Sequence, residues 1–193
     1  MIIYIHGFGS HGMGAKANIL RRYCQERNIR FIAPSLSTIP DLAITTLEEL
    51  IEAFRPTENV YLVGSSLGGY YALYLSHKYH IPCVLINPAI HPYRTLEKAL
   101  EYVPSFYDQS VYEWNGSHLD MLRKYDVNPP CGEKTLLLVQ MGDEVLDYTE
   151  AVEKLSDGKV VIEEGGNHGF EGFENYCESI VKFFSSETSN VGI

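Results

Sequence analysis

The sequence has little positive charge. Its 193 residues include 15 Lys and Arg against 25 Asp and Glu, for a formal net charge of -10, and no run of basic residues follows one face. Nucleic acids and anionic membranes attract cationic surfaces, so this balance disfavours both as partners. Function is therefore expected to reside in a pocket for a small molecule.

The start of the given sequence also lacks the pattern of a targeting or membrane segment. The first ten residues, MIIYIHGFGS, have no basic start, and the apolar run between Met1 and His6 is far too short to cross a bilayer. We expect a soluble, cytoplasmic protein with no membrane partner.

Cysteine is sparse and lacks metal-binding spacing. Cys24, Cys83, Cys131 and Cys177 lie far apart, without a C-x-x-C pair. Unpaired cysteines usually behave as small buried hydrophobic residues. The spacing predicts buried free thiols and disfavours both a disulfide framework and a zinc site.

Linkers and low-complexity tracts are absent, so residues 1–193 are expected to form one domain. Short apolar runs alternate with amphipathic helical patterns. The predicted strands are Met1–His6, Ile29–Pro34, Asn59–Gly64, Pro82–Asn87, Thr135–Met141 and Lys159–Glu164. Runs that are apolar throughout are typical of strands buried on both faces. The alternation predicts an α/β fold with a compact, mostly parallel six-stranded sheet and helices on both faces.

The segment 89–134 interrupts this alternation. It is about twice as long as the other connections and mixes short helical pieces with Pro, Gly, Asn and aromatic residues. Long connections inside a domain are usually functional covers or disordered, and the aromatic content argues against disorder. We interpret 89–134 as a small cap inserted over a pocket. The last nine residues, SSETSNVGI, are expected to be frayed.

A polar turn stands in the most hydrophobic part of the chain. Gly64-Ser65-Ser66-Leu67-Gly68 fits G-x-S-x-G, follows a predicted strand and opens a predicted helix. That context is typical of a nucleophile elbow, which predicts Ser66 as the catalytic nucleophile. A phosphate-binding loop is disfavoured because no lysine follows the glycines. A plain strand-to-helix turn remains the alternative.

A serine nucleophile needs a base and a group that orients the base. Among seven histidines, His168 is best placed, in a Gly-rich loop after the last strand. The preceding strand is followed by Asp143, Glu144 and Asp147. Asp143 is favoured because it comes first after the strand, and Asp147 remains the alternative. The order Ser66, Asp143, His168 is the order that such a hydrolase requires.

The loop after the first strand, His6-Gly7-Phe8-Gly9-Ser10, is rich in small residues that let a ligand approach the backbone. The N–H groups of Phe8 and Leu67 are the expected oxyanion donors, each typically worth about 3 kcal/mol in the transition state. His6 and His11 lack a neighbouring carboxylate or cysteine, so no metal site is predicted there.

Several stretches occur together in order: His6-Gly7-Phe8, Gly64-Ser65-Ser66-Leu67-Gly68-Gly69, Asn87-Pro88-Ala89, Gly142-Asp143-Glu144-Val145-Leu146-Asp147-Tyr148 and Gly166-Asn167-His168. With them the chain resembles the α/β-hydrolase superfamily and, more narrowly, the YqiA-like family of small bacterial esterases. The resemblance covers essentially the whole chain. It implies hydrolysis of short-chain acyl esters by the triad above, no cofactor, and a fold without the leading antiparallel hairpin of the superfamily.

The substrate is less defined by the sequence. Gly7, His11 and Tyr70 are expected to contact a small acyl ester, although tyrosines in such patterns more often belong to the core. One alternative is an acyl-CoA thioesterase with the same triad, which the excess of acidic residues in the cap disfavours. The other is a hydrolase-fold binding protein without catalysis.

Overall fold

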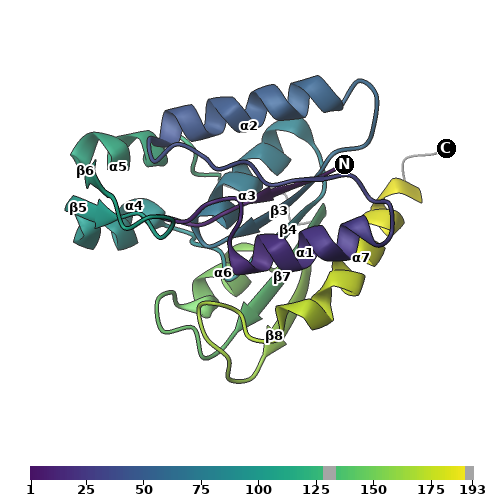
Figure 1. The fold of residues 1–193 in the computed structure, drawn as a ribbon. Coiled ribbons are helices and arrows are strands. Elements are labelled where there is room, and N and C mark those ends of the chain that lie inside the picture. The colour runs from purple at the N-terminus through teal and green to yellow at the C-terminus, as the bar shows by residue number, and fades with distance from the viewer. Residues whose placement is uncertain (128–133, 190–193) are drawn as a thin grey trace.

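A six-stranded sheet with the order β2-β1-β3-β4-β7-β8 forms the centre of the computed structural model, which describes residues 1–127 and 134–189 (Figure 1). The strands are β1 Ile2–Ile5, β2 Phe31–Ile32, β3 Tyr61–Ser65, β4 Cys83–Ile86, β7 Thr135–Gln140 and β8 Lys159–Glu163. Every pairing between neighbouring strands of this sheet is parallel. Each of the six predicted segments contains a strand, so this part of the prediction is confirmed. Among the described residues no antiparallel strand precedes β1.

The four central strands, β1, β3, β4 and β7, are mostly apolar and buried because both faces of the sheet are covered there, whereas the edge strands β2 and β8 are only partly buried. In β1, Ile3 and Ile5 belong to one buried cluster, whereas Ile2 and Tyr4 belong to the cluster on the opposite face. Successive side chains of a strand point to opposite faces, so two covered faces leave no position for a polar alternation.

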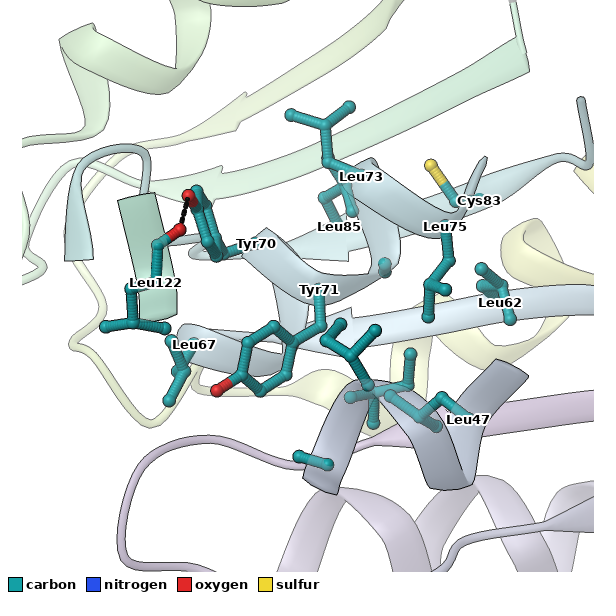
Figure 2. Packing of buried hydrophobic residues seen from close by; sticks show 14 of the residues in the cluster. Leu47, Leu62, Leu67, Tyr70, Tyr71, Leu73, Leu75, Cys83, Leu85 and Leu122 are labelled. Carbon is teal, nitrogen blue, oxygen red and sulfur yellow. Dashed lines mark hydrogen bonds between the residues drawn. The ribbon is translucent and has the colours of Figure 1, made fainter. Parts of the chain in front are cut away.

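Five helices of the described chain cover the sheet: α1 Ala15–Gln25, α2 Pro40–Phe54, α3 Leu67–Tyr79, α6 Tyr148–Lys154 and α7 Cys177–Ser189. Helices α1 and α7, with the 3-10 turn η3 Phe173–Tyr176, pack on one face, and α2, α3 and α6 pack on the other (Figure 1). Figure 2 shows part of the cluster under α2 and α3, the one that contains Ile3 and Ile5; it includes Leu47 of α2, Leu62 of β3 and Leu75 of α3. This packing fixes the position of α3, whose N-terminus carries Ser66.

A small antiparallel insert separates β4 from β7. It consists of α4 Pro92–Thr95, η1 Leu96–Ala99, the hairpin β5 Glu101–Pro104 and β6 Val111–Trp114, and α5 Gly116–Arg123. The hairpin was not predicted, because its strands have four residues each and only Val103 and Trp114 among them are buried. Residues 128–133 of the predicted cap lie outside the described residues. The assignment of residues 1–193 to one domain, with 89–134 as a cap inserted within it, stays a prediction.

Cys24, Cys83 and Cys177 are buried and unpaired, as predicted, and Cys131 lies outside the described residues. Helix α7 continues to Ser189, so the first part of the segment predicted to fray is helical, and residues 190–193 lie outside the described part. Over residues 1–127 and 134–189, none of the helices combines the length and the apolar character that a membrane span requires.

Candidate active site

Ser66 occupies a strained turn between β3 and α3. Its backbone has φ 56° and ψ -122°, in the left-handed half of the map where residues with a Cβ are uncommon. The turn is held on both sides: the Ser66 N–H donates to the Ile86 carbonyl at 3.1 Å, and its own carbonyl accepts from Gly69 at 2.9 Å and Ala89 at 3.0 Å. These bonds fix the direction in which the hydroxyl leaves the sheet.

Two glycines permit this turn through close backbone approach. A Cβ on Gly64 would lie 2.2 Å from the carbonyl oxygen of Gly68, and a Cβ on Gly68 would lie 2.1 Å from the carbonyl oxygen of Ile5. No side chain fits at such distances, so the start of α3 can rest on β1 and β3 only because both positions are glycine.

The three residues predicted to cooperate lie in one hydrogen-bonded line. His168 Nε2 is 3.1 Å from Ser66 Oγ, and His168 Nδ1 is 2.8 Å from Asp143 Oδ2. The Asp143 side chain is only 2% exposed, whereas that of His168 is 23% exposed. The imidazole therefore joins a buried carboxylate to a hydroxyl that faces the cavity described below.

The acidic residues in the loop after β7 make different contacts. Asp143 Oδ1 accepts from the N–H groups of Val145 and Leu146, both at 2.9 Å. Burial acts to raise the pKa of Asp143, but the hydrogen bonds from His168, Leu146 and Val145 outweigh it, and the pKa lies below its ordinary value. Asp147 instead caps α6 by accepting from the Thr149 N–H at 2.9 Å.

Glu144 makes a contact that the sequence did not indicate. Its Oε2 accepts a hydrogen bond from the His168 N–H at 3.0 Å. The loops that follow β7 and β8 are thus joined through both the backbone and the side chain of His168.

Two buried amides hold the loop that carries His168, and sequence reasoning missed both roles. Asn87 Nδ2 donates to the carbonyl oxygens of Asn167 (3.0 Å) and His168 (3.3 Å), while its Oδ1 accepts from the N–H of Gln140. Gln140 Oε1 accepts from the N–H groups of Asn167 (3.1 Å) and Glu171 (2.8 Å). The available signal was a polar residue at the end of each apolar strand, β4 and β7.

The loop after β1 lies against Ser66. A Cβ on Gly7 would stand 3.1 Å from the Ser66 Cβ, so Gly7 leaves room beside the hydroxyl. The N–H groups of Phe8 and Leu67 are not among the donors of backbone hydrogen bonds in the turns and loops of the described chain. The Phe8 ring packs edge-on against Trp114 of the insert, with centroids 4.7 Å apart, which anchors this loop from outside.

His6 fixes the peptide between Gly7 and Phe8. Its Nδ1 lies 2.9 Å from the Gly7 carbonyl oxygen, and its Nε2 accepts from the Leu36 N–H at 2.9 Å. Because a carbonyl can only accept, Nδ1 carries the proton and the ring is neutral. Burial of the ring lowers the pKa of His6, and this burial is the largest influence on that pKa. The C=O and N–H of a trans peptide point in opposite directions, so holding the Gly7 carbonyl also directs the Phe8 N–H.

A cavity of about 630 Å³ opens at Ser66. It is lined by the loop after β1, the start of α1, the turn at Ser66, the insert and the loops that follow β7 and β8. Gly7, Phe8, His11 and Leu67 are among the lining residues. Tyr70, predicted to contact the substrate, is not: it is 2% exposed, and its hydroxyl donates to the Leu122 carbonyl at 2.7 Å (Figure 2). That tyrosine joins α3 to α5, and this part of the prediction is corrected.

A metal is not needed to explain these histidines. Both ring nitrogens of His6 are engaged by the backbone, and His11 Nδ1 accepts from the Met13 N–H at 3.2 Å. In the part of the chain that the structure describes, no group of three His, Cys, Asp or Glu side chains is arranged around a common point for a metal ion.

The sheet order, the strand-to-helix turn at Ser66 and the loops that meet there define an α/β-hydrolase fold. The structure is similar to Est1E from Butyrivibrio proteoclasticus, solved with ferulic acid, with a TM-score of 0.76 at 14% identity over 97% of this chain and 89% of that chain. It is also similar to a monoacylglycerol lipase from Paleococcus ferrophilus, with a TM-score of 0.69 at 17% identity over 96% of this chain and 93% of that one.

The chain belongs to the uncharacterised protein family UPF0227, whose model matches residues 1–185. A UPF0227 protein of Vibrio cholerae is 24% identical over 194 residues, covering 95% of this chain and 98% of that protein. The predicted resemblance to the α/β-hydrolase superfamily and to its YqiA-like members is confirmed at the level of fold and family.

Proposed function

We propose that the protein is a serine esterase that hydrolyses short-chain acyl esters. The observation that carries the proposal is the unbroken hydrogen-bonded line from Ser66 Oγ through His168 to Asp143 Oδ2. The likeness to an esterase solved with ferulic acid, a small carboxylic acid, supports a small ester as the substrate class. A cavity of about 630 Å³ has the size of a small-molecule site.

The proposed reaction begins at Ser66. Ser66 Oγ attacks the ester carbonyl while His168 Nε2 takes the hydroxyl proton, and the charge on the carbonyl oxygen is held by the N–H groups of Phe8 and Leu67. His168 then passes the proton to the departing alkoxide. Water, deprotonated by His168, attacks the acyl-Ser66 ester, and collapse of that intermediate releases the acid and restores the serine.

A fluorophosphonate probe tests this proposal directly. The probe should form one covalent adduct with the native protein, on Ser66, and hydrolysis of p-nitrophenyl butyrate should fall in proportion to labelling. Peptide mass spectrometry locates the adduct, and heat-denatured protein is the control. Absence of an adduct on Ser66 would favour a binding protein without catalysis. Higher kcat/KM on butyryl-CoA than on the aryl ester would move the substrate class to thioesters.

The loop after β1, which carries the proposed oxyanion donor Phe8, gives a second prediction, based on paired variants of His6. Asn at this position can keep a donor near the place of Nδ1, and Gln can keep an acceptor near the place of Nε2. If the Gly7 carbonyl is what directs the Phe8 N–H, His6→Gln should lower kcat by roughly tenfold, less than the loss of a whole donor, whereas His6→Asn should change it less. Steady-state kinetics on p-nitrophenyl butyrate measures both variants, with circular dichroism as the control for folding. Equal kcat in the two variants would contradict the proposed role of the hydrogen bond from His6 Nδ1 to the Gly7 carbonyl.

A further inference from the structure

The cavity beside Ser66 has a charge opposite to that of the whole chain. Among the described residues, its lining includes Lys16 and Lys98 and neither Asp nor Glu, in a protein with a net charge of -10. A cavity lined by charge of one sign raises the local concentration of ligands of the other sign. The lining therefore points to an anionic group on the molecule that enters.

The two cavity lysines also differ from most others in their partners. Five lysines form ion pairs with a carboxylate: Lys78, Lys124, Lys154, Lys159 and Lys182. Over the described part of the chain, no ion pair involves Lys16 or Lys98. Lys16 Nζ donates to the Gly169 carbonyl at 2.9 Å, which uses one of its three N–H donors. Two donors of a partly buried ammonium remain for a ligand.

The charge of Asp143 acts on Lys16 without an ion pair between the two side chains among the described residues. Burial lowers the pKa of Lys16, and the charge of Asp143 offsets part of this effect. The oxygens of Asp143 accept from His168, Val145 and Leu146. Glu144 accepts from the N–H of His168. Both carboxylates are thus engaged with the histidine and its neighbouring loop.

The position of Lys16 indicates which part of an ester it faces. In the proposed reaction His168 must reach the departing oxygen, so the alcohol part of the ester lies against the loop that carries His168. Lys16 Nζ donates a hydrogen bond to the carbonyl oxygen of Gly169, the residue after His168 in that loop. Resting on the proposed esterase function, we propose that the substrate is an ester whose alcohol part carries a carboxylate, bound by the Lys16 ammonium.

The test uses two esters of nearly the same shape, the anionic 4-acetoxybenzoate and the neutral 4-acetoxybenzamide, and each kcat/KM is divided by that ester's own rate of hydrolysis by hydroxide. Wild-type protein should favour the anionic ester by about tenfold or more in kcat/KM, the size of a charge-assisted hydrogen bond. Lys16→Met should bring this ratio close to one, and Lys16→Arg should keep a preference. The matched control is Lys124→Met, which removes a surface lysine paired with Asp41 and should leave the ratio unchanged. If Lys16 only supports the Gly169 loop, both esters will slow by the same factor, and the inference fails.

A binding measurement separates this inference from the proposed function. NMR titration with 4-hydroxybenzoate and 4-hydroxybenzamide, the two alcohol products, requires no turnover. The acid should bind wild-type protein more tightly than the amide, and Lys16→Met should remove the difference. Equal binding of the two products to wild-type protein would overturn the inference even if Ser66 is labelled and neutral esters are hydrolysed. Charge-dependent binding without a Ser66 adduct would support the anion site and reject the esterase.

Discussion

Replacing Ser66 with Ala is expected to lower kcat on p-nitrophenyl butyrate by a factor on the order of 10⁵ to 10⁶, because the proposed acyl-enzyme can no longer form. A residual rate above that in water should persist, since the proposed oxyanion donors, the N–H groups of Phe8 and Leu67, would still polarise a bound carbonyl. The fold should be unaffected: Ala keeps the Cβ that Ser66 already places at φ 56°.

Ser65 provides the matched control within the same motif. It is 4% exposed and shares a side-chain hydrogen bond with Tyr4, whereas His168 Nε2 lies against Ser66. Ser65→Ala should therefore lower stability by about 1 kcal/mol, through loss of that bond, with kcat changed by far less. Kinetics and thermal unfolding of both variants make the comparison. A Ser66→Ala protein that retains near-normal esterase activity would remove the nucleophile from the proposal.

Features encoded in short stretches of sequence were predictable. The six strands were found because each contains a short apolar run, which both sheet faces bury in the central strands β1, β3, β4 and β7. The turn at Ser66 was found because glycines must stand where backbone approaches backbone. In the structure the turn lies between β3 and α3, as the pattern indicated. Such signals are local, so a single sequence suffices to recognise them.

Contacts between distant segments were not predictable in the same way. Asn87 holds a loop some 80 residues further along the chain, and nothing around it indicates that partner. The pattern around Tyr70 favoured the core over a pocket without deciding between them, because the direction of this side chain depends on its contact with α5 in the insert. The insert hairpin was missed for a related reason: its side chains are mostly exposed, so no hydrophobic period marks its strands.

Choosing between Asp143 and Asp147 requires both the local sequence and the contact with His168, which lies far along the chain. Both follow β7 within a few residues, and the sequence only favoured the first. In the structure Asp143 contacts His168 Nδ1, and Asp147 begins α6. These two carboxylates, four residues apart in the sequence, provide a pair of substitutions with opposite expected outcomes.

Asp143→Asn is expected to lower kcat by a factor on the order of 10⁴. Asn can still accept from the Val145 and Leu146 N–H groups through Oδ1, so the loop should keep its shape. Its Nδ2 would then face His168 Nδ1 and donate to it, which moves the imidazole proton to Nε2. A protonated Nε2 cannot take the proton of Ser66, and the proposed first step is blocked.

Asp147→Asn should leave kcat nearly unchanged, because Asn is as good an N-cap as Asp for α6.

The pKa of Asp143 lies below its ordinary value, so its carboxylate remains charged at neutral pH and would support the imidazolium that forms in the proposed reaction. The contribution of this low pKa to stability is complete above about pH 4, the ordinary range of an Asp, and is lost as the pH falls through the lowered value. Asp143→Asn should therefore also flatten the acid limb of the stability profile, which Asp147→Asn should not do to the same extent, since Asp147 is exposed. Kinetics at neutral pH and urea unfolding between pH 3 and pH 7 measure both variants. A larger loss of kcat from Asp147→Asn would require a different arrangement of residues 143–148 from the one that places Asp143 against His168.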